Sequence, residues 1–226
     1  TPMFFRSAFL NQNLLVAHFT FFAWLALVWR RGDGPNQNPP AEPWRPAAAG
    51  AWLGAAVVCD YSAVPLALVF ALWDAVSRAR RLGLGAGLRS LALCAAGAAL
   101  PLAVLLAYQY AAFGSAWLPA QAYMPATDLS VVGWHGLHAP MTDLLWRNLF
   151  DPAYGVFVFC PMLALALAAP WRASLRAMLR REELWLLLGA PVALWLFCSA
   201  IAFARLQWNT GVRYLVPAVP LLFVAA

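Results

Sequence analysis

Apolar residues come in blocks long enough to cross a lipid bilayer, and this feature constrains the fold more than any other. A helix needs about 20 apolar residues to cross the hydrocarbon core of a membrane. Only 11% of the residues are charged, whereas a soluble domain carries roughly a quarter. The sequence therefore predicts an all-α, polytopic transmembrane helical bundle and excludes a soluble globular domain. The blocks lie at about 8–29, 47–76, 90–109, 153–170, 184–203 and 213–226.

The net charge and the cysteines exclude two other classes of site. The formal net charge is +6, but arginines in short connections between the blocks supply it, which indicates topology determinants and no nucleic-acid partner. No cysteine has a partner at metal-ligand spacing, so neither a zinc site nor a disulfide framework is indicated. We therefore expect a surrounding lipid bilayer and no metal or cofactor. The four cysteines are Cys59, Cys94, Cys160 and Cys198.

Arginine is distributed unevenly among the connections. Eleven of the fifteen arginines lie in three of them, while the long stretch 110–152 holds only Arg147. Because cytoplasmic loops are enriched in basic residues, we expect these three connections to be cytoplasmic and 110–152 to form a periplasmic loop. The chain contains no lysine and is rich in Ala, Leu and Gly. This composition is typical of some bacterial proteins, so we expect the membrane to be a bacterial inner membrane. The eleven are Arg30, Arg31, Arg45, Arg78, Arg80, Arg81, Arg89, Arg172, Arg176, Arg180 and Arg181.

The first two Arg-rich connections can share one side of the membrane only if the block between them, 47–76, crosses twice. We expect a hairpin of two short helices that breaks around Asp60, near the periplasmic face. Each arm would have about 13–15 residues, or roughly 20 Å at 1.5 Å per residue, which is less than a core of about 30 Å. The alternative is one long tilted helix with Asp60 at mid-membrane. With the hairpin, the chain has about seven membrane segments.

The ends of the chain indicate its domain organisation. It starts at Thr1 without an initiator Met, ends at Ala226 inside an apolar block, and shows no signal peptide. We therefore expect residues 1–226 to form a single transmembrane domain that is a fragment of a longer protein, truncated at both ends.

Two ionisable residues near the membrane require an explanation, because burying such a group costs about 2.5–3.5 kcal/mol on insertion scales. Asp60 could act as a base or orient a hydroxyl, or it could cap the second arm of the hairpin. Arg213 opens the last block beside Trp208 and Tyr214. Its planar guanidinium suits a phosphate, or it could snorkel to lipid head groups. The residues alone leave both alternatives open.

Further candidates lie in the stretch 110–152 and in the first span. Aromatic rings and carboxylates together suit sugar binding, and His135 and His138 have the spacing of a metal pair. No third ligand supports that pair, so no metal site is predicted. Asn13 and His18 could hydrogen-bond between helices or line a substrate cavity. The aromatic and acidic residues of the stretch are Trp117, Tyr123, Trp134, Asp128 and Asp143.

Several stretches, in their order along the chain, resemble one family of membrane enzymes. They are similar to the C-terminal half of a bacterial GT-C membrane glycosyltransferase related to the protein O-mannosyltransferases (glycosyltransferase family 39). GVRYLVPAVP and LFDPAYGVF carry the resemblance most specifically. The stretches are FLNQNLLVAH (9–18), AGAWLGAAVVCDYSAVPLAL (49–68), YQYAAFGSAW (108–117), NLFDPAYGVFVFCPML (148–163) and WNTGVRYLVPAVPLL (208–222).

The resemblance implies transfer of a sugar from a polyprenyl-phosphate donor to an acceptor hydroxyl at the periplasmic face. It implies an acidic catalytic base in a loop before Thr1, and donor-phosphate binding by Arg213 with the adjoining Tyr214. Members of the family often have Lys where this chain has Asp60, and a carboxylate there would repel a phosphate. The candidates for a substrate cavity are Asn13, His18, Asp60, Tyr61 and Trp208.

Two other functions stay open. A transporter or flippase of lipid-linked glycans would show inverted repeats or polar residues through several spans, and neither pattern is obvious. A polymerase or ligase of lipid-linked glycans would also be polytopic with periplasmic arginines. An Asp or Glu pair just after the first span of the upstream sequence would favour the transferase.

Overall fold

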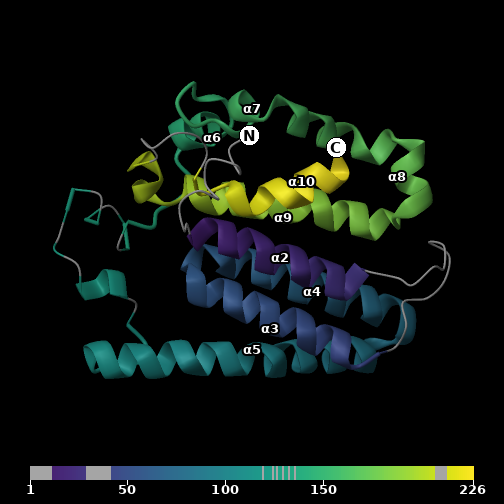
Figure 1. Cartoon of the computed structure of the whole chain (residues 1–226), viewed down its shortest axis with the longest axis horizontal. Helices are drawn as coiled ribbons and strands as arrows, with labels where there is room; N and C mark the ends of the chain where they lie inside the picture. Colours follow the sequence, from purple (N-terminus) through teal and green to yellow (C-terminus); the bar gives the residue numbers. More distant parts are fainter. Residues whose placement is uncertain are drawn as a thin grey trace.

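The chain folds into two groups of helices that pack side by side (Figure 1). The computed structural model describes residues 12–28, 42–118, 120–123, 125, 127–128, 130–131, 133–134, 136–206 and 213–226. The first group contains α2 (Gln12–Val28), α3 (Trp44–Cys59), η1 (Tyr61–Ala63), α4 (Val64–Leu82) and α5 (Leu84–Phe113). The later elements are η2 (Ala120–Tyr123), α6 (Thr142–Phe150), α7 (Val156–Phe159), η3 (Pro161–Trp171), α8 (Ala173–Met178), α9 (Arg181–Ser199), η4 (Ala202–Leu206), η5 (Val216–Ala218) and α10 (Val219–Ala225).

The described residues form helices, and their only extended pairings are two isolated bridges. Among the residues that the structure describes, three helices are long and apolar enough to cross a membrane: Tyr61–Leu82, Leu84–Phe113 and Arg181–Ser199. Shorter apolar helices cover Gln12–Val28 and Val216–Ala225. The prediction of an all-helical fold, with helices long and apolar enough to cross a membrane, is thus confirmed for the described residues, while the count of about seven segments stays a prediction.

The block 47–76 breaks at Asp60, and its two arms run in opposite directions (Figure 1). Asp60 has an extended backbone, with φ −160° and ψ 129°, so the alternative of one continuous helix is wrong. The predicted arm lengths were too short. The first arm starts at Trp44, and the second arm with η1 has 22 residues, about 30 Å at 1.5 Å per residue. Arg78, Arg80 and Arg81 extend it, because cations favour the C-terminal end of a helix dipole.

Small residues allow α3 and α5 to pack unusually close together. A Cβ atom on Gly50 would lie 1.9 Å from the carbonyl oxygen of Cys94, and one on Gly97 would lie 1.9 Å from that of Ala47. Helices in membranes commonly associate through such residues, because backbones can approach where side chains are small. This contact places α3 between α2 and α5, and the core of the first group forms around it.

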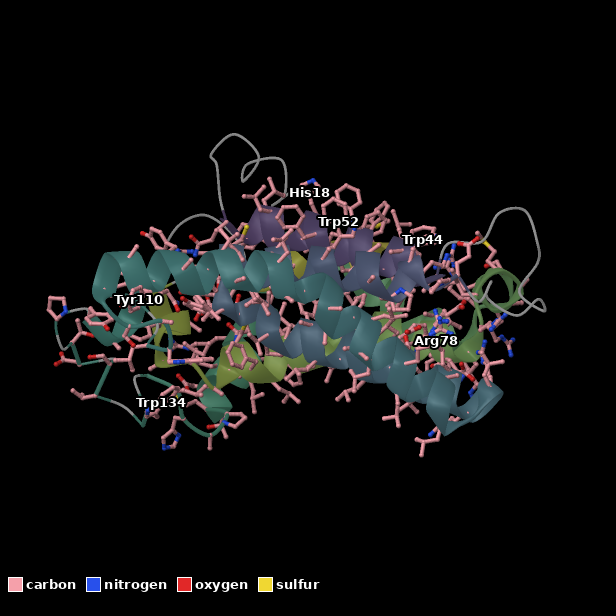
Figure 2. The ribbon with its side chains drawn as sticks, turned by 90° about the horizontal axis from the view of Figure 1, so that it is seen from below. His18, Trp44, Trp52, Arg78, Tyr110 and Trp134 are labelled. Carbon is pink, nitrogen blue, oxygen red and sulfur yellow. The ribbon has the colours of Figure 1, made fainter. Side chains whose placement is uncertain are left out.

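Most of the described arginines gather at one end of the molecule, which we call the Arg-rich end. It consists of the N-terminal ends of α3, α5 and α9, the C-terminal end of α4, and α8 (Figure 1). The opposite, Arg-poor end contains the break at Asp60 and the C-terminal ends of α5 and α9. Figure 2 shows Trp44 and Arg78 toward the first end and Tyr110 and Trp134 toward the second. This arrangement agrees with the grouping expected for the described arginines, whereas Arg30 and Arg31 lie outside the described residues. Which face is cytoplasmic stays a prediction.

The stretch 110–152, predicted to be a loop, is partly helical. Helix α5 continues to Phe113 and ends at Gly114, which adopts the left-handed conformation with φ 72°, as is common just after a helix. Helix α6 also lies within the stretch, and the preceding segment docks on the end of α9. There, the His138 amide donates to the Ala200 carbonyl at 2.8 Å and the Met141 amide to the Ser199 carbonyl at 2.9 Å.

The block 153–170 is not one regular helix. It consists of α7 and η3, separated at Cys160, which has φ −137° and ψ 71°. Pro161 explains the break, because the ring of a proline disfavours helical backbone at the residue before it. The apolar pattern could not show this interruption, and a membrane crossing by this block stays a prediction.

Candidate functional site

Asp60 caps the second arm of the hairpin and ties it to α2. Its Oδ1 atom accepts a hydrogen bond from the Ser62 backbone amide at 2.8 Å. Its Oδ2 atom accepts one from Gln12 Nε2, also at 2.8 Å. An Asp at this position satisfies an amide that would otherwise have no partner within the helix. The capping interpretation is thus confirmed, while any part in catalysis stays a prediction.

Tyr61 connects the same break to α5. Its hydroxyl accepts a hydrogen bond from Nε2 of Gln109, a buried residue near the C-terminal end of α5. A buried amide is costly without such a partner. Asp60 and Tyr61 therefore hold the ends of α2, α3, α4 and α5 together at the Arg-poor end.

Arg213 and Tyr214 lie at this end as well, in the turn before η5. The guanidinium carbon of Arg213 lies 5.4 Å from the centroid of the Tyr214 ring, which is within the range of a cation–π contact. The Cys198 Sγ atom of α9 lies 3.9 Å from the Tyr214 carbonyl oxygen and donates to it. Burial raises the pKa of the Tyr214 hydroxyl; the Arg213 guanidinium opposes this rise, and the Asp60 carboxylate adds to it. The structure thus brings a carboxylate, a guanidinium and two phenol rings to one end of the bundle.

The candidates from the first span separate in the structure. Asn13 is buried inside the bundle. His18 is exposed, and its Nδ1 atom lies 2.7 Å from the Leu14 carbonyl oxygen of the same helix. Figure 2 shows His18 and Trp52 along one outer edge of the molecule, where the Trp52 ring stacks on Phe19. A place for His18 in a shared cavity is therefore not supported, and Trp208 lies outside the described residues.

The candidates from 110–152 do not form a single cluster. Trp117 and Trp134 are exposed, and the Tyr123 ring stacks on Phe113 with their centroids 4.8 Å apart. Within the described part of the chain, no three His, Cys, Asp or Glu side chains could hold a metal ion together. His135 lies outside that part, so the structure does not describe how His135 and His138 lie relative to each other.

Sequence reasoning missed two members of the site. Gln12 binds Asp60 and Gln109 binds Tyr61. Gln109 did carry a signal, because it is a single amide at the end of a long apolar block, and buried polar groups in such blocks need partners. Gln12 carried none of its own, since it stands in a polar run that includes the better candidate Asn13.

Comparison with known proteins does not assign the chain to a family. No protein-family model matches the chain, and no curated protein or solved structure is significantly similar to it. The chemistry of the site must therefore be argued from its own residues.

Proposed function

We propose that this chain forms part of a multi-pass enzyme of a bacterial inner membrane, which transfers a sugar from a polyprenyl-phosphate donor to an acceptor hydroxyl. The reaction would take place at the Arg-poor end, on the periplasmic side. The observation that supports this most is the position of Arg213. It lies over the Tyr214 ring and shares this end with Asp60, whereas most other arginines are at the opposite end.

The position suits a lipid-linked phosphate for physical reasons. The isoprenoid tail prefers the hydrocarbon core, while the phosphate requires either water or a matching charge, so the reacting group must stay near the interface. A guanidinium binds phosphate oxygens in pairs because its N–H groups form a planar fork. Arg213 at the end of a helical bundle can thus meet the phosphate at the depth where the lipid presents it.

The transfer step follows from this placement. The acceptor oxygen forms a bond to the anomeric carbon of the sugar as the bond from that carbon to the phosphate oxygen breaks. The hydroxyl proton passes to an acidic base, which the family resemblance places before Thr1. The polyprenyl phosphate leaves with the bonding electrons, and Arg213 stabilises the negative charge that develops on it. Asp60 accepts hydrogen bonds from Gln12 and from the Ser62 amide and so holds the helix ends beside the proposed site.

The proposal is tested by replacing Arg213 in the intact protein, reconstituted in liposomes with a labelled polyprenyl-phosphate sugar. We expect Arg213→Ala to lower the rate of transfer by about 100-fold or more, the size seen when a donor to a developing oxyanion is removed. Membrane insertion and helix content should not change, because the residue is only partly buried.

Arg147→Ala provides the matched control. Arg147 is an exposed arginine of α6 near the same end, and we expect its removal to leave transfer nearly unchanged. Full activity of the Arg213 variant would overturn the donor-phosphate assignment. Movement of the intact labelled lipid across the bilayer without sugar transfer would instead support a flippase.

A further inference from the structure

A cleft at the Arg-rich end is not used by the proposed reaction. It has a volume of about 660 Å³ and lies between the end of η3, helix α8 and the start of α9. Clefts that bind small ligands have volumes of roughly 300–1,000 Å³. Its walls include three arginines and two tryptophans: Arg176, Arg180, Arg181, Trp171 and Trp185.

The charge of this cleft is positive because the two acidic residues next to it, Glu182 and Glu183, do not line it. Glu182 points to Arg81 of α4 and forms an ion pair with it. Glu183 is buried, and its Oε2 atom accepts the backbone amide of Arg180 at 2.8 Å. Arg176 and Arg181 are both exposed and line the cleft, and Nη2 of Arg176 donates to the Trp171 carbonyl oxygen at 3.4 Å. Their guanidinium groups thus remain accessible to an anion.

The tryptophans indicate the depth of the cleft relative to a bilayer. Trp171 is 76% exposed and Trp185 is 54% exposed, although an indole ring is largely apolar. Trp side chains concentrate at membrane interfaces, where one part of the ring is in contact with lipid and the other with water. The apolar helix α9 starts at the cleft and continues away from it. The guanidinium groups therefore lie at the level of lipid head groups.

We propose that this cleft binds a phosphate ester, presented either as the head group of an anionic phospholipid or as a soluble phosphate monoester. Paired N–H groups of Arg176 and Arg181 bind the phosphate oxygens, as guanidinium groups do in many phosphate sites. Basic pockets between membrane helices are known to take phospholipid head groups. The two tryptophans flank the phosphate and contact the glycerol or acyl region when the ligand is a lipid.

The test compares two variants of the full chain that lose the same number of charges. Arg176→Gln/Arg181→Gln removes the two exposed arginines of the cleft. Arg80→Gln/Arg89→Gln removes two exposed arginines of α4 and α5 that do not line it. Each protein is purified in neutral detergent and exposed to phosphatidylglycerol, to phosphatidylcholine or to glycerol 1-phosphate. Native mass spectrometry measures retained lipid, and calorimetry measures binding of the soluble ester.

We expect the wild-type chain and the Arg80/Arg89 variant to retain phosphatidylglycerol in preference to phosphatidylcholine. The affinity of the cleft variant for phosphatidylglycerol should fall by about tenfold or more, because this variant loses charge-assisted hydrogen bonds to the phosphate. Binding of glycerol 1-phosphate with the same dependence on Arg176 and Arg181, without retention of the lipid, would identify a soluble ester as the ligand.

Two results would overturn the proposal. One is equal binding by the cleft variant and the wild-type chain. The other is an equal loss in both variants, since this would make the effect one of overall charge. Circular dichroism establishes that the variants are helical. If a double variant does not fold, the single variants Arg181→Gln and Arg80→Gln provide the same comparison. The sugar-transfer assay is independent of this result, because Arg213 lies at the opposite end.

Discussion

Acidic side chains at the two ends of the molecule have different kinds of hydrogen-bond partner. At the Arg-rich end, both carboxylate oxygens of Asp74 accept from Arg78 Nε at 3.0 Å, and the Ser90 hydroxyl donates to the same group. Glu182 forms an ion pair with Arg81 there. At the Arg-poor end, Asp60 accepts from a side-chain amide and a backbone amide, both neutral donors.

The difference separates acids that pair with an arginine from an acid that is held by neutral donors. Asp74 binds Arg78 on the next turn of α4 and Ser90 on α5. Glu182 of α9 pairs with Arg81 of α4. The backbone carbonyl of Glu182 also accepts a hydrogen bond from the Trp73 indole at 2.9 Å. An acid neutralised by an arginine has little charge left for a ligand. The two groups that donate to Asp60 carry no charge of their own. Replacing each acid by its amide therefore tests whether the two ends really differ.

Asp74→Asn should have the largest effect in this series. The side chains of Asp74 and Arg78 are each only 11% exposed, and the amide would leave the guanidinium without its counter-charge. Removing one partner of a buried ion pair costs about 3–5 kcal/mol. Because this pair is not fully buried, we expect the free energy of unfolding to fall by about 2–3 kcal/mol. Chemical unfolding of the full chain in detergent micelles measures it.

Arg80→Gln controls for the loss of one charge at the same end. Its exposed side chain lies in the last turn of α4, so we expect a loss of only about 0.3–1 kcal/mol from the helix dipole. If Asp74→Asn and Arg80→Gln cost the same, the buried pair does not stabilise the bundle and the two ends do not differ in this respect.

Glu182→Gln should have an intermediate effect. The Arg81 and Glu182 side chains are 24% and 38% exposed, and exposed ion pairs contribute about 0.2–1 kcal/mol. The backbone contact with Trp73 survives the replacement, so α9 stays attached to α4. A double-mutant cycle with Arg81→Gln measures the coupling directly. A coupling energy of several kcal/mol would mean that this pair, and not Asp74, is the main charged link at the Arg-rich end.

The sequence contained much of this architecture. Blocks of about 20 apolar residues predicted helices, and a polar break with a following proline predicted the hairpin at Asp60. The distribution of arginine predicted that several connections share one side. These features could be read because each depends on residues close together in the chain.

Other features depend on contacts between distant segments. Asp74 was overlooked inside an apolar block, although an acid four residues before Arg78 is a recognisable helical pair. The arginines were assigned to loops, whereas Arg78 and Arg81 are helical and reach Asp74 and Glu182. The cleft brings Trp171 and Trp185 together across α8, and no local pattern in the sequence specifies that the chain turns back there.

Asp60→Asn should have the smallest effect and gives the sharpest contrast with Asp74→Asn. Asn caps helices about as well as Asp, and its oxygen can still accept from Ser62 or Gln12. We expect the free energy of unfolding to change by less than about 0.5 kcal/mol, whereas Asp60→Ala loses the cap and costs about 1 kcal/mol. Unfolding in micelles measures both, and the liposome assay of the intact protein measures transfer.

We expect Asp60→Asn to keep its activity, because the residue positions helix ends through hydrogen bonds that an amide can also make. A large loss of transfer at unchanged stability would show instead that the negative charge itself takes part in the reaction.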